Sequence, residues 1–128
     1  MNPLLKASAI CYSAIGAAGL LTPDRIPAAF GGEAATPDAR TEVRAVYGGI
    51  PLAIAGLVMT RPRQSAFPAA TLSAGMALGR LTGMSLEKQS SPATRFFLGV
   101  EVALALALLQ RDHADLAFRV EVLLGRHL

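Results

Sequence analysis

Four stretches of the chain are almost free of charged residues, and short segments that carry most of the charge separate them. The stretches cover residues 7–23, 45–60, 64–79 with a continuation over 81–86 beyond Arg80, and 96–110 with Glu101 as an interruption. A helix that crosses a bilayer needs about 20 mostly apolar residues, whereas 10–14 also suit a buried helix of a soluble protein. Because two of the stretches reach only 15 or 16 residues, length alone does not separate membrane helices from soluble ones.

Helix-start signals extend the short stretches. Asn2-Pro3, Thr36-Pro37 and Ser91-Pro92 each place an N-cap residue directly before a proline at the first helical position. With these starts, the pattern predicts four spans at about residues 3–22, 37–60, 65–86 and 92–111. The sequence Thr22-Pro23-Asp24 repeats the signal and predicts a short helical turn in the first loop.

A soluble four-helix bundle is the main alternative to a membrane protein. Each of its helices would need a polar stripe that faces water. The first stretch offers only scattered, uncharged polar residues, and residues 45–60 hold no charge at all. We therefore expect an all-α protein in which residues 1–128 form a single integral membrane domain, a four-transmembrane-helix bundle.

The C-terminal tail, residues 112–128, differs from the predicted spans. Leu116, Val120, Leu123 and Leu124 fall on one side of a helix, while charged residues fall elsewhere. This amphipathic pattern predicts a short C-terminal interfacial helix. A fraying terminus is the alternative.

Composition agrees with a membrane location. Hydrophobic residues make up 52% of the chain and charged ones 16%, against about 25% charged in soluble domains. The mean hydropathy is +0.44, which excludes a disordered chain. The pI of about 9.6 reflects 12 Lys and Arg against 9 Asp and Glu, without the local basic cluster that a phosphate-binding face needs. We therefore expect no nucleic-acid partner.

Basic residues in the loops indicate an orientation. For four spans, the N-terminus, the Arg61-Pro62-Arg63 turn and the tail share one side, which carries six basic residues against four on the other. The two sets are Lys6, Arg61, Arg63, Arg111, Arg119 and Arg126, and Arg25, Arg40, Lys88 and Arg95. Because cytoplasmic loops are enriched in Lys and Arg, we expect both termini in the cytoplasm and the chain in a bacterial inner membrane.

Small residues recur at four-residue intervals on three predicted spans. The longest ladder is Thr71, Gly75, Gly79 and Gly83, and the shorter ones are Ala45, Gly49 and Ala53, and Gly99, Ala103 and Ala107. Such spacing lets helix backbones approach closely in lipid, so we expect these residues, and Gly48 next to Gly49, to pack between helices. For the two shorter ladders, chance recurrence in Ala- and Gly-rich helices is an equal alternative.

The few ionisable residues inside the predicted spans lie at one depth. Arg44, Arg80 and Glu101 fall in the outer half of the bundle, and Tyr47 lies one turn deeper than Arg44 on nearly the same face. Charged residues are costly in lipid and usually face a partner or a cavity. We call Glu42, Arg44, Tyr47, Arg80 and Glu101 the candidate polar cluster.

Two interpretations of this cluster stay open. In the structural one, Arg80 and Glu101 form an ion pair that joins two helices, and Arg44 pairs with Glu42 or reaches the lipid headgroups. In the functional one, Arg44, Arg80 and Glu101 together carry a charge of +1. Their planar guanidinium groups then bind the anionic or polar headgroup of a lipophilic molecule.

Other chemistry finds little support in the sequence. His113 and His127 lie in the tail without a third ligand, so we expect no metal site. Cys11 is the single cysteine, which excludes an internal disulfide, and no base lies near it. It is expected to be a small buried hydrophobe. We expect no cofactor and no enzymatic activity.

One stretch carries a resemblance to a known family. Glu42-Val43-Arg44-Ala45-Val46-Tyr47-Gly48-Gly49, with Gly79-Arg80 and Glu101, resembles a bacterial family of small integral membrane proteins, domain of unknown function 4345. The resemblance extends over nearly the whole chain. It implies a four-helix membrane protein, similar in broad architecture to DoxX-like proteins, with no established biochemical activity. The motif positions it implies are Glu42, Arg44, Tyr47, Gly48, Gly49, Arg80 and Glu101.

Three functions are compatible with these features. The first is a membrane-embedded binding or accessory protein, with a polar pocket in the outer half of the bundle for an amphipathic or anionic small molecule. The second is a small oligomeric proton-coupled transporter in which Glu101 exchanges protons. The third is a structural subunit of a larger membrane complex, or a homo-oligomer, that uses the face of Gly75, Gly79 and Gly83 for its partner.

Overall fold

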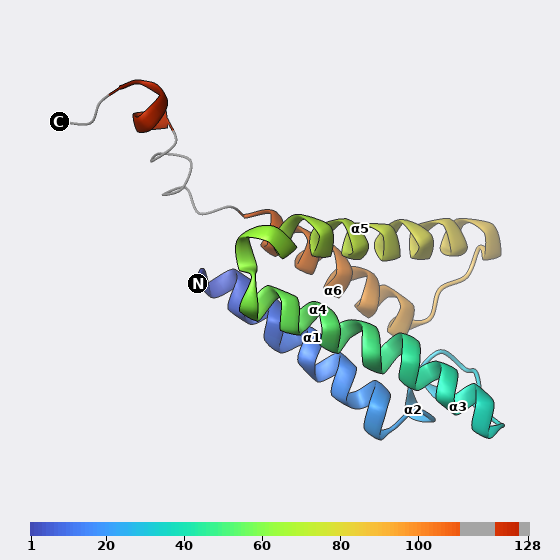
Figure 1. Cartoon of the computed structure of the whole chain (residues 1–128). Helices are drawn as coiled ribbons and strands as arrows, with labels where there is room; N and C mark the ends of the chain where they lie inside the picture. The colour runs from blue at the N-terminus through green and yellow to red at the C-terminus, as the bar shows by residue number, and fades with distance from the viewer. Residues whose placement is uncertain (111–119, 126–128) are drawn as a thin grey trace.

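A computed structural model describes residues 1–110 and 120–125 of the chain, and every regular element in residues 1–110 is a helix (Figure 1). The elements are α1 (Pro3–Leu21), α2 (Arg25–Ala28), α3 (Pro37–Val43), the π-helical segment η1 (Arg44–Gly49), α4 (Ile50–Thr60), α5 (Pro62–Glu87) and α6 (Pro92–Leu109). Helix α3, η1 and α4 follow one another without a break. The expectation of an all-α protein is therefore confirmed.

The three predicted helix starts are confirmed by their capping hydrogen bonds. The side chain of Asn2 accepts a hydrogen bond from the backbone N–H of Leu4 at 2.9 Å. Thr36 and Ser91 accept in the same way from backbone N–H groups three residues later, both at 3.1 Å. Helix α2 is the short helical turn expected in the first loop. The starts were predictable because a cap and its proline act within one helical turn.

Within residues 1–110 and 120–125, three helical stretches are long and apolar enough to cross a membrane. They are Pro3–Leu21, Pro37–Thr60 and Pro92–Leu109. Helix α5, the fourth expected span, has 26 residues and reaches about 39 Å at 1.5 Å per residue. It is less apolar than the other three, because it carries Arg80 and several hydroxyl side chains.

Pro51 explains the π-helical segment in the middle of the second stretch. A proline has no backbone N–H, and its ring collides with the carbonyl group four residues earlier in a regular α-helix. That carbonyl belongs to Tyr47, which lies inside η1. The wider π turn relieves the collision.

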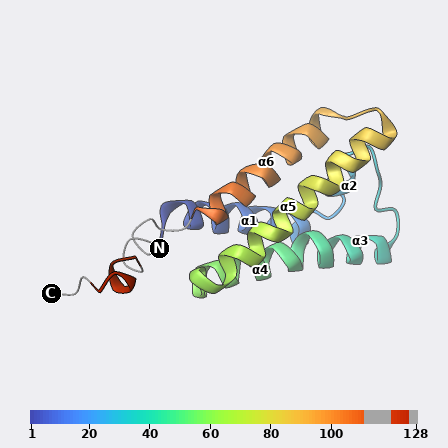
Figure 2. The same cartoon turned by 90° about the horizontal axis from the view of Figure 1, so that it is seen from above.

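The long helices form two pairs. Helix α1 packs on η1 and α4, and α5 packs on α6. Toward the end where α2 and α3 lie, α5 diverges from the α3–α4 helix in both views, and α6 does so in the second (Figures 1 and 2). Helix α1 also contacts α6, so the two pairs share one core.

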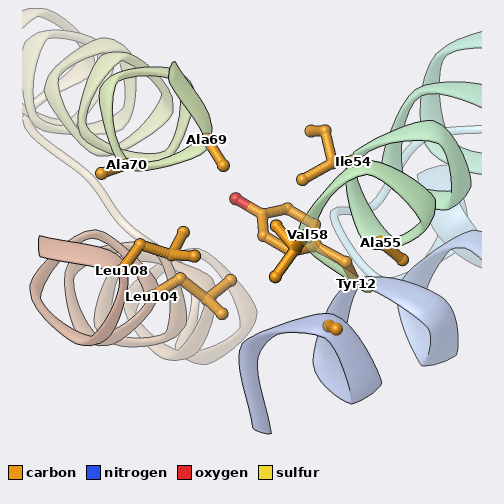
Figure 3. Close-up of a cluster of buried hydrophobic side chains, with 9 residues drawn as sticks. Tyr12, Ile54, Ala55, Val58, Ala69, Ala70, Leu104 and Leu108 are labelled. Atoms are coloured by element: carbon orange, nitrogen blue, oxygen red, sulfur yellow. The ribbon is translucent and has the colours of Figure 1, made fainter. Parts of the chain in front are cut away.

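The core lies where the two pairs converge (Figure 3). Its buried residues are Ala9, Tyr12, Ile54, Ala55, Val58, Ala69, Ala70, Leu104 and Leu108. The ring of Tyr12 lies in the middle of this cluster, and its hydroxyl points toward α5, where it is hydrogen-bonded to the hydroxyl of Ser73. This bond joins α1 to α5 across the core.

Replacing Tyr12 by Phe is expected to lower the free energy of unfolding by about 0.5–1.5 kcal/mol, the usual contribution of one hydrogen bond. Ser73 keeps its bond to the Ala69 carbonyl oxygen at 3.0 Å, so no buried donor is left without a partner. Thermal unfolding in detergent, followed by circular dichroism, measures the change. A double-mutant cycle with Ser73→Ala isolates the bond, and a coupling energy near zero would contradict this role.

The two ends of the bundle are distinct. Arg61 alone connects α4 to α5, and the side-chain Nδ2 of Asn2 donates to the backbone carbonyl oxygen of Gln110 at 3.3 Å. The N-terminus, the α4–α5 connection and the end of α6 therefore share one end, which we call the turn end (Figure 1). The connections at residues 22–36 and 88–91 lie at the opposite end, the loop end.

The predicted interfacial helix falls mostly outside the described residues. Residues 111–119 and 126–128 are not described, and of the tail only residues 120–123 are helical in the described part. The interfacial helix after the bundle stays a prediction.

Close backbone contact occurs between α1 and η1. A Cβ atom at Gly19 would lie 2.3 Å from the Tyr47 carbonyl oxygen, and one at Gly16 would lie 3.0 Å from that of Gly48. A Cβ at Gly48 would in turn meet the side chain of Leu20 at 2.7 Å. Of the glycines expected to pack between helices, Gly48 therefore does so in the described chain.

The other expected packing residues have more open surroundings. A Cβ at Gly75, Gly79, Gly83 or Gly99 would have no neighbouring atom within 4 Å, and one at Gly49 would meet only the Arg44 carbonyl oxygen, at 3.9 Å. Ala103 is exposed. The α5 ladder therefore faces away from the described helices, and its role in contacts between chains stays a prediction.

Candidate functional site

Arg80 and Glu101 face each other across the interface between α5 and α6. The Nε atom of Arg80 lies 2.8 Å from Oε1 and 2.9 Å from Oε2 of Glu101. Glu101 is only 5% exposed, while the side chain of Arg80 is 22% exposed. The carboxylate is therefore buried, and the guanidinium lies nearer the surface.

Two neighbouring aromatic rings lie against the guanidinium group of Arg80. The ring centroids of Phe30 and Phe97 lie 5.2 and 5.4 Å from its carbon atom, within the range of cation–π attraction. The two rings also contact each other, with centroids 5.4 Å apart. Phe97 belongs to α6 and Phe30 to the connection between α2 and α3, so three segments meet at Arg80.

Neither ring was among the predicted site residues. Phe97 precedes Glu101 by four residues, which places both on one face of a helix, so a search for i, i+4 neighbours of Glu101 would have found it. Phe30 offers no such signal, because its approach to Arg80 depends on the path of a loop.

The hydrogen bonds of the pair use only one of the nitrogen atoms of Arg80. A guanidinium has five N–H donors, of which Nε supplies one. The Nη1 and Nη2 atoms donate to no acceptor within residues 1–110 and 120–125. Every fully buried side-chain nitrogen or oxygen in this part of the chain has a hydrogen-bond partner. Because Nη1 and Nη2 have none, they are not fully buried and can be reached from the surface.

The remaining members of the candidate polar cluster lie apart from this pair. Arg44 donates through Nε to the backbone carbonyl oxygen of Leu20 at 3.2 Å, close to the C-terminal end of α1. A cation at this position is favourable, because the last carbonyl groups of a helix carry partial negative charge. Glu42 and Tyr47 are exposed. The structure thus brings Arg80 and Glu101 together and gives Arg44 a separate contact.

The π-helical segment changes the geometry on which the spacing of Arg44 and Tyr47 was judged. In an α-helix, residues three apart lie on nearly the same face. Both residues belong to η1, whose turns are wider. A spacing of three therefore no longer places one side chain above the other.

Other reactive groups lie away from the Arg80–Glu101 pair or outside the described chain. Cys11 is half-buried and packs against the hydrophobic core. Among the described residues, no group of three or more His, Cys, Asp or Glu side chains is arranged to hold a metal ion. His113 and His127 lie outside the described residues.

Chemically, the site is a neutral ion pair with spare donors. Glu101 cancels the charge of Arg80 and fixes the guanidinium through Nε, while the two neighbouring rings contact it. The +1 charge expected for the cluster included Arg44, which instead caps α1. The arrangement can therefore donate hydrogen bonds to a carbonyl, carboxylate or phosphate oxygen, with weaker long-range attraction for anions than a free arginine would have.

Comparison with known proteins identifies a family. The family described as "Domain of unknown function (DUF4345)" matches residues 1–110, from the first helix to the end of α6, and the chain belongs to it. No curated protein and no solved structure matches the chain. The family description names no activity, so a function has to be argued from the geometry of the site.

Proposed function

We propose that this member of the DUF4345 family is a multi-pass membrane protein that binds the polar or anionic headgroup of an amphipathic small molecule at Arg80. The spare Nη donors of a guanidinium that Glu101 holds by Nε alone are the observation that carries this proposal. The proposed role is binding, without a catalytic step.

Satisfied polar groups support α5 as a fourth membrane span. The exposed hydroxyls of Thr71, Thr82 and Ser85 donate to carbonyl oxygens four residues earlier, at 2.8–3.0 Å. Polar groups in hydrocarbon must be satisfied within the protein, and these bonds do so without a partner helix. Glu101 neutralises the one charged residue in the middle of the helix, Arg80.

Large exposed apolar side chains support a lipid environment around the bundle. Only 28%, 28% and 22% of the residues in the three apolar stretches are buried inside the protein. Examples of exposed side chains on four helices are Ile10 (61%), Leu57 (50%), Leu78 (64%) and Leu106 (60%). A soluble monomer rarely exposes apolar surface on this scale, whereas hydrocarbon would cover it.

The charges of the two ends support an orientation. Within residues 1–110, the charged side chains at the turn end are Lys6, Arg61 and Arg63, whereas basic and acidic residues are mixed at the loop end. By the positive-inside rule, we place the turn end and both termini in the cytoplasm of a bacterium and the Arg80 site in the outer half of its inner membrane.

A structural role in a larger complex or homo-oligomer is the second candidate. It has its own observation, the outward-facing ladder of Gly75, Gly79 and Gly83 on α5. Mild solubilisation followed by size measurement tests it. A chain that migrates as a monomer with its lipid retained would count against a partner on this face.

Arg80→Lys is expected to abolish ligand binding while the helices stay folded. Lysine keeps the positive charge beside Glu101 but lacks the planar Nη donors. The probes are dodecanoate and its methyl ester, added to the protein in nanodiscs while the melting temperature is recorded. We expect dodecanoate to raise the melting temperature of the wild type more than the ester does, and to have no effect on Arg80→Lys.

Arg95→Lys is the matched control, because Arg95 lies near the loop end and, among the described residues, its side chain donates a hydrogen bond only to the Ser90 carbonyl oxygen, at 3.4 Å. It should respond to dodecanoate as the wild type does. A rise in melting temperature that persists in Arg80→Lys would contradict the proposal, and so would the lack of any rise in the wild type.

A further inference from the structure

A groove lies between α4 and α5 at the turn end of the bundle. Its volume is about 230 Å³, and its lining residues are Ile54, Leu57, Arg61, Gln64, Ser65, Pro68, Ala69 and Leu72. Ser65 and Arg80 are separated by about 22 Å along α5, at 1.5 Å per residue. The groove is therefore a different site from the one at Arg80.

The walls of the groove are apolar, and its polar groups gather at one end. Ile54, Leu57 and Leu72 belong to the walls. Arg61 forms the α4–α5 connection, and Gln64 lies in the first turn of α5 beside it. The Oγ atom of Ser65 lies 3.0 Å from the Leu57 carbonyl oxygen and 2.8 Å from that of Arg61, so this hydroxyl already has partners. Hydrocarbon thus fits the groove without leaving a buried polar group unsatisfied.

Pro68 also lines the groove, inside α5. With Arg61 next to Gln64, the groove has a cation near its mouth and an apolar channel beyond it.

Arg61 supplies a fixed positive charge at the mouth. It is the single residue between Thr60, the last of α4, and Pro62, the first of α5, so its position is set by both helices. Its side chain makes no hydrogen bond within the part of the chain that the structure describes. No acidic residue of segment 1–110 lies at this end, which favours an anionic group over a neutral one.

The size of the groove restricts its occupant. Pockets that enclose a drug-sized molecule measure roughly 300–1,000 Å³. A volume of about 230 Å³ is smaller, and Leu57 and Leu72 at its sides are 50% and 51% exposed. An occupant must therefore place one slender apolar segment in the groove and leave the rest of its mass outside.

We infer that the α4–α5 groove binds one acyl chain of an anionic phospholipid, whose phosphate contacts Arg61. This inference rests on α4 and α5 crossing the membrane, but it does not depend on ligand binding at Arg80. The phospholipid belongs to the leaflet at the turn end. Its second chain stays in the bilayer, and Arg61 selects anionic headgroups over neutral ones.

The test compares bound lipids after reconstitution in nanodiscs of phosphatidylglycerol and phosphatidylethanolamine with identical acyl chains. Native mass spectrometry of the released protein counts the lipids of each kind that remain bound. We expect the wild type to retain phosphatidylglycerol preferentially, and Arg61→Gln to lose roughly fivefold of that preference, the usual effect of one basic residue near an anionic surface. Lys6→Gln, which removes a charge at the same end but outside the groove, should keep it.

A second pair of variants tests the acyl-chain channel separately from the charge. Leu57→Trp places an indole in the groove and should reduce the bound lipid of either headgroup. Met59→Trp adds the same ring to α4 at a position that is 52% exposed and does not line the groove, so it should retain the lipid.

The outcomes decide between a site and ordinary boundary lipid. Equal loss of preference in Arg61→Gln and Lys6→Gln would overturn the inference, because it would indicate surface potential alone. Undiminished lipid in Leu57→Trp would also overturn it. The dodecanoate response at Arg80 is recorded for the same variants. Its presence or absence distinguishes failure of the groove from failure of the proposed function.

Discussion

Arg80→Ala is expected to lower the free energy of unfolding by about 3–5 kcal/mol, the cost of removing one partner from a buried ion pair. Glu101 is 5% exposed, and Arg80 is its only side-chain partner within residues 1–110 and 120–125. The substitution would leave its carboxylate buried without a donor. It would also remove the contacts of the guanidinium with Phe30 and Phe97.

Two further variants separate the unpaired charge from the lost contacts. Arg80→Met combined with Glu101→Leu removes both charges, and it should be far more stable than Arg80→Ala alone, because well-packed apolar residues often replace a buried pair without loss. Glu101→Gln should cost less than Arg80→Ala, since Arg80 is 22% exposed and can be solvated at the surface. Unfolding in mixed micelles gives the three values.

A small effect of Arg80→Ala would contradict this account. If the single variant lost less than about 1 kcal/mol, the carboxylate would have found another donor or water. If the double variant were as unstable as the single one, the cost would lie in the aromatic contacts and not in the unpaired charge. The folded double variant also serves the binding proposal, since it should show no response to dodecanoate.

Gly19→Ala is expected to be the most damaging small substitution, with a loss of about 3 kcal/mol, at the upper end of the usual cost of overpacking. The added Cβ would lie 2.3, 2.4 and 2.6 Å from the carbonyl oxygen and carbon of Tyr47 and the nitrogen of Gly48. These are backbone atoms of η1, which cannot move aside as a side chain can. The clash therefore has to separate α1 from the helix that contains η1.

Gly56→Ala is the control for this substitution. Gly56 lies in the middle of α4, and a Cβ there would have no neighbour within 4 Å. It should be neutral or slightly stabilising, because alanine favours a helix over glycine by about 1 kcal/mol. Thermal unfolding of both variants in the same detergent makes the comparison. Equal stabilities would show that α1 and η1 are not in close backbone contact.

Features that depend on one helical turn were predictable from the sequence. Asn2, Thr36 and Ser91 are N-caps because a side-chain acceptor and a following proline act on the nearest backbone groups. The pairing of Arg80 with Glu101 was also one of the two interpretations, since two charges at equal depth on neighbouring antiparallel helices tend to meet. The prediction of the Arg80–Glu101 pair needed only the rise per residue and the direction of each helix.

Features that depend on helix rotation were not predictable. The longest small-residue ladder is on α5, yet the glycines in close contact are Gly16, Gly19 and Gly48, which follow no strict four-residue spacing. Spacing shows which residues share a face, but not which face turns toward a neighbour. Arg44 shows the same limit, because its contact with the Leu20 carbonyl oxygen depends on how α1 ends beside η1.

The order in which Arg80 and Glu101 are synthesised has a consequence for biogenesis. Arg80 leaves the ribosome 21 residues before Glu101. An arginine opposes the transfer of a helix from the insertion machinery into lipid, by about 2.5–3.5 kcal/mol at the helix centre and by less in the outer half, where Arg80 lies. In the proposed topology with α5 as a fourth span, this helix therefore gains its neutralising partner only when α6 emerges, which favours entry of the two helices as a joined hairpin. Glu101, which stabilises the finished bundle by pairing with Arg80, would thus also couple the insertion of α5 to the translation of α6.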